Sequence, residues 1–344
     1  MGNSGGRIDS GCMLKEASFY SVFNSGKNIL SCELCPRACK IPPGEKGFCG
    51  VRKNSGGKLY ALTYGKFSSI NLDPLEKKPL YNFFPGKEVL SVGSAGCNFT
   101  CPWCQNSGIS QAPADNIQLR EADIGELLAL ARTYNSVGIA YTYNEPLINF
   151  EFVRDCAEEF HKNSLKNVLV TNGFINEKAL ASLLPFIDAA NIDIKFFRQD
   201  FYKKYCGGNL GDVMRSVEMF VKAGKHIELT LCVIPGLNDN ENDFREMVNW
   251  IWALAPSIPL HISRYFPAYK YSAQPTSLKT LNRLRDIAVQ KLDFVYQGNV
   301  SGQTGTYCPS CKTLLISREG YRTEIKALNG NSCANCGAAL PIVL

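Results

Sequence analysis

Between residues 87 and 300, short apolar runs alternate with amphipathic stretches, and this alternation restricts the possible folds more than any other feature. Strands are predicted at 88–94, 137–143, 167–173, 189–196, 226–234, 259–266 and 292–298, and helices at 120–134, 149–163, 176–184, 210–223, 240–254 and 277–290. Strands that alternate with helices become parallel, because right-handed crossovers join them. The chain is therefore predicted to be α/β, with either a barrel or an open doubly wound sheet.

Polar residues follow three of these predicted strands, in the runs YNEP (143–146), TNG (171–173) and DIK (193–195). The carboxyl ends of parallel strands meet at one edge, and the active sites of barrels and open α/β sheets lie there. Asp193 and Lys195 are two residues apart, so both point to the same face of their strand. The sequence predicts an active site at this edge.

Fifteen cysteines are many for a chain without an apolar export signal, and clustered thiols in a reducing compartment favour metal over disulfides. Three clusters hold eleven of them: Cys32, Cys35, Cys39 and Cys49; Cys97, Cys101 and Cys104; and Cys308, Cys311, Cys333 and Cys336. The remaining Cys12, Cys156, Cys206 and Cys232 are predicted to be small buried side chains. Cys232 shares a strand face with Glu228 and Thr230, so it could also reach a barrel interior.

The clusters divide the chain into four predicted segments. Residues 1–30 form a tail and lead-in that begins with a flexible stretch, and residues 31–86 form a loop-rich segment with the first cysteine cluster. Residues 87–300 form the α/β domain. Residues 301–344 begin with a linker, SGQTG, and carry the last cluster in a small module.

The composition, with 45% hydrophobic and 20% charged residues, is typical of a soluble globular protein. No apolar run reaches membrane-spanning length and no secretory signal is present, so we expect a cytoplasmic protein without a membrane partner. The net charge of +6 is scattered along the chain, which indicates a solvated surface. A nucleic-acid partner is therefore not expected.

The run CNFTCPWC (97–104) places three cysteines in one short loop after the first predicted strand of the α/β domain. Cysteine thiolates are the usual ligands of iron–sulfur clusters, and three of them leave one iron of a four-iron cluster open. An open metal site marks catalysis rather than structure. The alternative is that a remote cysteine or histidine completes the site.

This spacing, with Trp103 before the last cysteine, resembles the signature of the radical S-adenosylmethionine (SAM) superfamily. The resemblance implies a partial (β/α)6-type TIM barrel with a 4Fe-4S cluster on Cys97, Cys101 and Cys104. It also implies that SAM binds the open iron and is cleaved reductively to methionine and a 5′-deoxyadenosyl radical, which abstracts hydrogen from a substrate. A flavodoxin- or ferredoxin-type protein would be the reductant.

Two further motifs extend the resemblance to the SAM site. Asn144 and Glu145 stand where the superfamily has a Gly-Gly-Glu-Pro-like motif for the SAM amino group, and Asn144 replaces a glycine. Asn172 lies in VTNGF, which is similar to a motif of glycyl-radical activating enzymes. Val170 replaces the aspartate of that motif, which puts a cation site there in doubt.

The DIK run resembles the SAM-binding strand of the activating enzymes, and His261 occupies a position where these enzymes often carry a SAM-contacting histidine. A lysine that points into a barrel needs an anionic partner, and the SAM carboxylate would serve Lys195. The alternatives are an ion pair of Lys195 with Asp193, and a structural role for His261.

The order of these motifs, together with the N-terminal run CELCPRACKIPPGEKGFCGVR, is similar to the radical SAM protein of the AmmeMemoRadiSam system from about residue 14 onwards. That family is similar to pyruvate formate-lyase activating enzyme across the barrel. The resemblance implies AMMECR- and Memo-family proteins as partners, but it supplies no substrate.

Two cysteine-rich appendages flank the predicted barrel. In the tail, CPSC and CANC are separated by 21 residues, and paired knuckles of this kind close a tetrahedral site for zinc or rubredoxin-like iron. The N-terminal set has gaps of two, three and nine residues. It is predicted to be a structural zinc or iron site, with an auxiliary iron–sulfur cluster as the alternative.

Three functions fit these motifs. The chain is a radical SAM enzyme that acts on a protein or peptide, as a glycyl-radical activase does, or one that acts on a small molecule. The third function, from another class, is a metal-stabilised binding scaffold without turnover. A scaffold without turnover would be expected to have lost a cysteine of the three-cysteine motif. All three cysteines are present, so this function is the least favoured.

Overall fold

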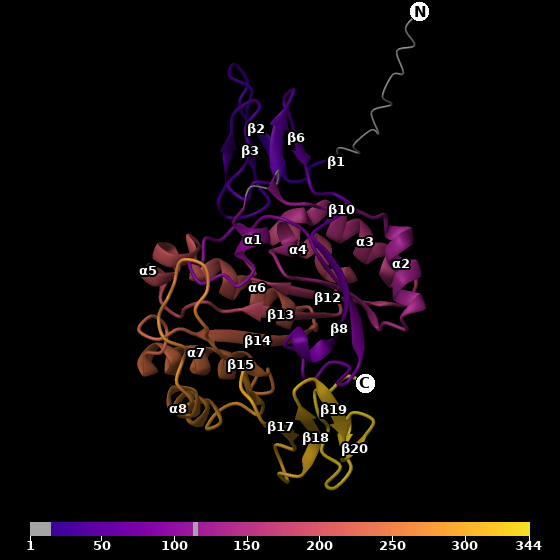
Figure 1. Ribbon diagram of the computed structural model, residues 1–344, viewed down its shortest axis with the longest axis vertical. Coiled ribbons are helices and arrows are strands. Elements are labelled where there is room, and N and C mark those ends of the chain that lie inside the picture. The colour runs from indigo at the N-terminus through magenta and orange to yellow at the C-terminus, as the bar shows by residue number, and fades with distance from the viewer. Residues whose placement is uncertain (1–14, 113–115) are drawn as a thin grey trace, which may run out of the picture.

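The computed structural model describes residues 15–112 and 116–344 (Figure 1). The predicted flexible stretch 1–10 and Cys12 lie outside these residues. At the centre is an eight-stranded sheet in the order β16-β15-β14-β13-β12-β11-β9-β8. Its strands are β8 (Ser69–Pro74), β9 (Glu88–Gly93), β11 (Gly138–Tyr141), β12 (Lys166–Thr171), β13 (Ala189–Asp193), β14 (His226–Val233), β15 (Leu260–Arg264) and β16 (Val295–Gly298).

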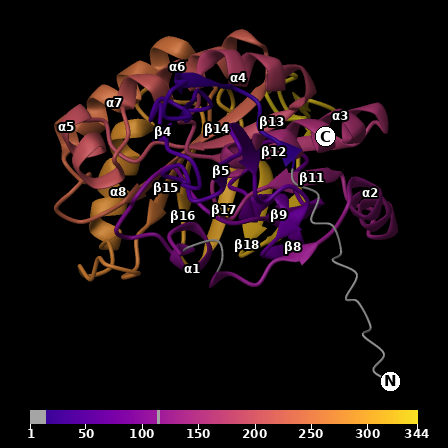
Figure 2. The same cartoon turned by 90° about the horizontal axis from the view of Figure 1, so that it is seen from above.

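Seven of these strands are parallel, as the strand–helix alternation predicted. The two edge strands, β8 and β16, do not pair with each other, so the sheet is an open, partial barrel. The helices form an arc around the outside of the strands (Figure 2). They are α2 (Ile124–Thr133), α3 (Phe150–Lys162), α4 (Glu177–Leu183), α6 (Leu210–Lys222), α7 (Glu241–Leu254) and α8 (Leu278–Ala288). The predicted α/β fold is confirmed.

Side-chain caps explain where the outer helices begin. Asp123, Asn209, Asn240 and Ser277 each accept hydrogen bonds from backbone N–H groups of the first turn of the helix that follows. The helix predicted from residue 120 therefore starts only at Ile124. The two residues Arg120–Glu121 form strand β10 instead, paired with β7 (Lys66–Phe67).

The segment 31–86 consists mainly of loops and turns, with short strands between them. It contributes β8, which adds to β9 in antiparallel fashion, and most of two small sheets at the top of Figure 1. These sheets contain β1 (Lys15–Glu16), β6 (Lys58–Ala61) and β5 (Arg52–Ser55), and β2 (Tyr20–Asn24), β3 (Ile29–Cys32) and β4 (Lys40–Ile41). Gly56 and Gly57 both have positive φ, as a tight hairpin requires, so these glycines mark a turn between strands.

A buried ion pair ties these N-terminal sheets to the barrel. Arg52 donates to both carboxylate oxygens of Glu151 on α3, at 3.0 and 3.1 Å, and to the Ser18 carbonyl at 2.6 Å. Both side chains of the pair are almost fully buried. The bidentate geometry compensates for the desolvation of the two charges, and it holds the N-terminal cysteines in place against the barrel.

The tail packs at the opposite end of the barrel from the N-terminal sheets (Figure 1). It contains β17 (Gln303–Tyr307), β18 (Leu314–Glu319), β19 (Arg322–Ile325), β20 (Leu328–Asn329) and β21 (Ser332–Cys333). The buried Arg318 joins it to the barrel by donating to Thr306 and to the Tyr81 carbonyl. No helix of the described residues combines the length and apolarity needed to cross a membrane.

Candidate active site

A cavity of about 570 Å³ opens at the carboxyl ends of the parallel strands. Nine of the ten cysteine and SAM-site residues predicted for the barrel line it, and the exception is His261. They come from the ends of β9, β11, β12 and β13 and from the loops that follow. The tertiary structure therefore brings most of the predicted site together, at the edge where a parallel sheet places its active site.

The loop that carries Cys97, Cys101 and Cys104 is held by the side chain of Asn144. This amide accepts a hydrogen bond from Ser94 N at 2.9 Å and donates to the carbonyls of Ala95 and Gly96, at 3.1 and 3.0 Å. Asn144, which replaces a glycine of the superfamily motif, thus makes its hydrogen bonds to the backbone that leads into the cysteine loop. These bonds position the loop.

Cys206 lies against the cysteine loop, although the sequence predicted it only as a buried core thiol. It ends the π-helical turn η5 (Tyr202–Cys206), and its sulfur atom is 3.6 Å from that of Cys101. This contact lowers the pKa of Cys101, whereas burial and the same contact raise the pKa of Cys206 well above its usual value. Once Cys101 binds metal as a thiolate, only Cys206 can donate a proton across this contact.

Glu145 is a buried carboxylate aimed at the same cavity. It accepts hydrogen bonds from Thr171 Oγ1 at 2.7 Å, Asn172 N at 2.8 Å and Leu147 N at 3.0 Å. Burial raises its pKa to about 7 despite these three donors. A buried acid without a cationic partner in its hydrogen-bond set is suited to receive a positively charged ligand group.

Asn172 connects Glu145 with the cysteine loop. Its side-chain nitrogen donates to Asn98 Oδ1 at 2.8 Å and lies 3.8 Å from Cys97 Sγ, and its oxygen accepts from Phe174 N. The same side chain therefore orients the loop and offers a donor to the sulfur of a predicted cluster ligand.

Lys195 and Asp193 form an ion pair at 2.8 Å on the cavity wall. This is the pairing that the sequence left open as the alternative to a ligand contact. Burial disfavours the charge on Lys195, but Asp193 and Cys101 outweigh burial and keep the pKa of the lysine well above its usual value. The cavity therefore contains a fixed ammonium group.

His261 lies below the cavity. Its Nε2 atom is 2.6 Å from Oε2 of the fully buried Glu228, and its ring packs edge-on against Tyr81. Burial disfavours the charged form of Glu228, but hydrogen bonds from His226 and His261 lower its pKa to about 2. The position of His261 is explained by this carboxylate, and its predicted contact with SAM stays a prediction.

The four N-terminal cysteines line a separate small cavity next to Arg37, Arg52 and Asn98. Burial, followed by the charges of neighbouring thiols, raises the pKa of Cys35 to about 12. Cys32 and Cys49, which are separated along the chain, line the same cavity.

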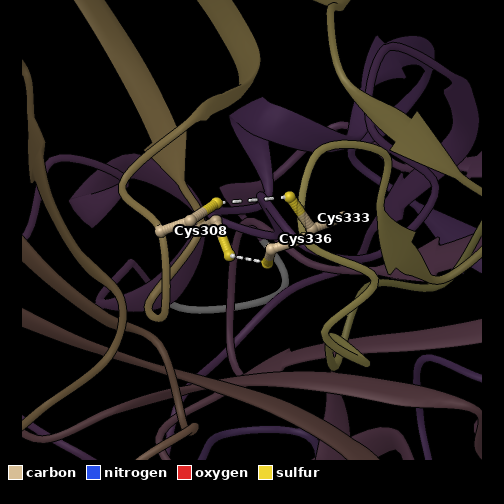
Figure 3. Close-up of side chains that lie close together, drawn as sticks. Cys308, Cys333 and Cys336 are labelled. Carbon is tan, nitrogen blue, oxygen red and sulfur yellow. Dashed lines mark hydrogen bonds between the residues drawn. The ribbon is translucent and has the colours of Figure 1, made fainter.

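The four tail cysteines converge on one point (Figure 3). The sulfurs of Cys308 and Cys336 are 3.7 Å apart, and those of Cys311 and Cys333 are 3.6 Å apart. A tetrahedral ion with metal–sulfur bonds of about 2.3 Å places its ligands about 3.8 Å apart. The tail is thus a four-cysteine group with the dimensions of a single-ion site.

Residues 91–251 of the chain match the family model of the radical SAM superfamily. The uncharacterized protein MJ0808 of Methanocaldococcus jannaschii is 42% identical over 338 residues, which cover 96% of this chain and all of that protein. The chain belongs to the radical SAM superfamily, and membership implies a 4Fe-4S cluster and SAM.

Other matches cover less of the chain. The 4-hydroxyphenylacetate decarboxylase activating enzyme of Clostridium scatologenes is 22% identical over 43% of this chain and 48% of its own length. A radical SAM methyltransferase structure from Sphaerobacter thermophilus is 17% identical, covers 62% of this chain and 67% of its own, and has a TM-score of 0.49. The chain is a radical SAM enzyme with homology to activating enzymes.

Several lining residues were not predicted from the sequence. They include Lys77 from the N-terminal segment, Thr142, Ser263, and Tyr321 from the tail. The interior-facing position of Cys232 was considered, and this residue does line the cavity. No motif marks Tyr321, because only the packing of the tail brings this residue to the cavity.

Proposed function

We propose that this cavity binds the 4Fe-4S cluster through Cys97, Cys101 and Cys104, with SAM beside it. The observation that carries the proposal is convergence: three thiols of one loop, the carboxylate of Glu145 and the ammonium of Lys195 face one cavity. In the described chain, the three sulfur atoms do not form a group within 4.8 Å of one another. This spacing suits the separate irons of a cluster better than a single ion.

When bound, the cluster supplies the electron that cleaves SAM to methionine and a 5′-deoxyadenosyl radical, which takes hydrogen from the substrate. The residues of the chain hold and shield these groups. Glu145 offers carboxylate oxygens to the SAM ammonium group, and Lys195 offers its ammonium group to the SAM carboxylate, so that no buried charge stays unpaired. Trp103, within this loop, is almost fully buried and packs against the ring of Phe196.

The substrate group is proposed to reside on a partner protein. The names of the activating enzymes that this chain resembles state that they act on another enzyme. The cavity also takes lining residues from the N-terminal segment (Lys77), from residue Asn299 after β16 and from the tail (Tyr321), so its mouth lies between three surfaces that a second chain can contact.

We further propose that the chain belongs to the AmmeMemoRadiSam system and acts in the cytoplasm. AMMECR- and Memo-family proteins would be its partners. The motif order from CELCPR to HISRYFP supports it. The reduced enzyme with SAM should form at least about tenfold more 5′-deoxyadenosine when a partner that carries the substrate is added. Equal formation with and without both partners would contradict this part of the proposal.

The central test is anaerobic SAM cleavage by the full chain, reconstituted with iron and sulfide and reduced with dithionite. Cys101→Ala should abolish 5′-deoxyadenosine formation, because the cluster loses one of three ligands. Cys156→Ala is the matched control, because this buried thiol on α3 lies outside the cavity. Undiminished cleavage by Cys101→Ala, in protein with an unchanged melting temperature, would rule out the assignment of the cluster to this loop.

A further inference from the structure

The four N-terminal cysteines form a site outside the active-site cavity. Cys32, Cys35, Cys39 and Cys49 all line one cavity, together with Leu34, Ile148 and the aliphatic and charged parts of Arg37 and Arg52. The cysteines come from β3, from the loop between β3 and β4, and from the loop before β5. The strands of the small N-terminal sheets and the loops between them therefore bring these four thiols together.

The spacing of the sulfur atoms separates this site from the tail site. In the described chain, the tail cysteines are the one set of three or more metal-ligating side chains whose ligand atoms all lie within 4.8 Å of one another. The N-terminal cysteines lack this compact arrangement, and so do Cys97, Cys101 and Cys104. A single tetrahedral ion requires the compact arrangement. A 4Fe-4S cluster binds each thiolate to a different iron, so its ligands stand farther apart.

Charge at the site fits an anionic cluster. Arg37 lines the cavity, and its hydrogen bonds go to two backbone carbonyls, Asn98 O at 2.6 Å and Cys206 O at 3.5 Å. Its guanidinium group also stacks on the ring of Phe48, with the carbon 3.4 Å from the ring centre. The positive charge is thus fixed beside the thiols by neutral groups, where it can balance a thiolate-bound cluster.

The N-terminal site and the active site adjoin at the loop that carries Cys97. Asn98 lines the N-terminal cavity, whereas its neighbour Cys97 lines the active-site cavity. In the same loop, a Cβ atom at Gly96 would lie only 2.4 Å from the Cys49 carbonyl oxygen. Gly96 is therefore required by the close approach of the two cysteine loops, and a substituent there would push them apart.

We propose that Cys32, Cys35, Cys39 and Cys49 hold a second 4Fe-4S cluster, which passes electrons to the cluster on Cys97, Cys101 and Cys104. This inference rests on the proposed function, because it needs the radical cluster as acceptor. One electron moves from a reduced flavodoxin- or ferredoxin-type protein to the second cluster and then to the radical cluster. No bond forms or breaks, and no proton moves.

The first test removes the radical cluster and leaves the N-terminal cysteines untouched. The triple variant C97A/C101A/C104A, reconstituted anaerobically, should retain about four irons of 4Fe-4S type by Mössbauer spectroscopy, in addition to the tail metal. The wild-type chain should contain about twice as much cluster iron. Zinc at the N-terminal site, or no cluster iron in the triple variant, would overturn the inference. This variant cannot cleave SAM, so the result is independent of the proposed function.

The second test addresses the proximity and the direction of electron flow. Two reduced clusters at adjoining sites should broaden each other's EPR signals in the wild type, and Cys35→Ala should leave one unbroadened signal. In stopped-flow experiments with reduced flavodoxin, Cys35→Ala should slow reduction of the radical cluster at least about tenfold relative to Cys156→Ala. Equal reduction rates would overturn the relay, and uncoupled wild-type signals would overturn the placement of the two clusters. Should Cys35→Ala fail to fold, the EPR spectrum of the wild type still decides the placement.

Discussion

At the scale of single residues, the active site depends on buried groups whose state is set by one or two contacts. The sulfur of Cys101 is 3.6 Å from that of Cys206, and Glu145 has three hydrogen-bond donors but no cation among them. These contacts change the free energy of the Cys101 thiolate and of the Glu145 carboxylate. A single substitution can therefore measure the effect of each contact.

Replacing Cys206 by alanine should make the reduction potential of the radical cluster more negative. The thiol donates to a cluster ligand, and hydrogen bonds to cluster sulfurs stabilise the reduced, more negative state. Loss of one such bond, about 0.5–1.5 kcal/mol, corresponds to about 20–60 mV for one electron. A redox titration followed by EPR measures the shift. Cys156→Ala serves as the control, and an unchanged potential in Cys206→Ala would show that the contact does not reach the cluster.

SAM affinity should weaken as the pH falls below about 7, because Glu145 has a pKa of about 7 and only its ionised form attracts an ammonium group. The dissociation constant, measured anaerobically by equilibrium dialysis, should rise by up to about tenfold per pH unit below that value. Above pH 7 it should level off. Glu145→Gln should bind SAM weakly with a flat pH profile, and a sloping profile in this variant would assign the titration to another group.

At the scale of secondary-structure elements, the important connection is between the end of β9 and the end of β11. Asn144, in the loop after β11, makes three hydrogen bonds to residues 94–96, which lead into the cysteine loop. Parallel neighbours in the sheet therefore position the cluster loop through one side chain.

Asn144→Ala should lower the free energy of unfolding by about 1–3 kcal/mol, because Ser94 N and two carbonyls lose their partner. It should also reduce the iron retained per chain after desalting, because the cysteine loop is less ordered. Denaturant titration and iron analysis measure the two effects. Asn242→Ala, at an exposed position on α7 outside the cavity, is the comparison. Full iron retention in Asn144→Ala would show that the loop is ordered by other contacts.

At the scale of the whole molecule, the two cysteine-rich appendages close opposite ends of an open barrel. The N-terminal sheets are fixed by Arg52 and Glu151, and the tail is fixed by Arg318 and by Thr323, which donates to Glu76. The tail also supplies Tyr321 to the active-site cavity. Its metal site should therefore affect the stability of the whole chain.

Cys333→Ser should release one metal ion per chain and lower the melting temperature by about 5–10 °C, because the tail loses the ion that closes its core. Metal analysis and thermal unfolding followed by circular dichroism test this. Asn331→Ala, two residues away and exposed, should change neither quantity. Retention of the metal by Cys333→Ser would contradict a four-thiolate site.

The sequence alone determined the parallel α/β sheet, the three cysteine clusters and most of the active-site lining. These features are local: an apolar period, a short spacing, or a polar residue at a strand end. Residues 31–86 were interpreted as loop-rich, and tertiary packing on Glu151 and β9 forms short strands within this segment. Propensity is too weak to decide short strands of two to six residues.

Only the tertiary structure decided which distant residues meet. It placed Cys206 against Cys101, directed His261 to Glu228, and made the neighbours Cys97 and Asn98 line two different cavities. Such contacts join residues up to about a hundred positions apart, and nothing in the local sequence encodes them. The sequence therefore determines the chemistry that is available to the chain, and the packing of the barrel and its appendages determines which groups can act on one another.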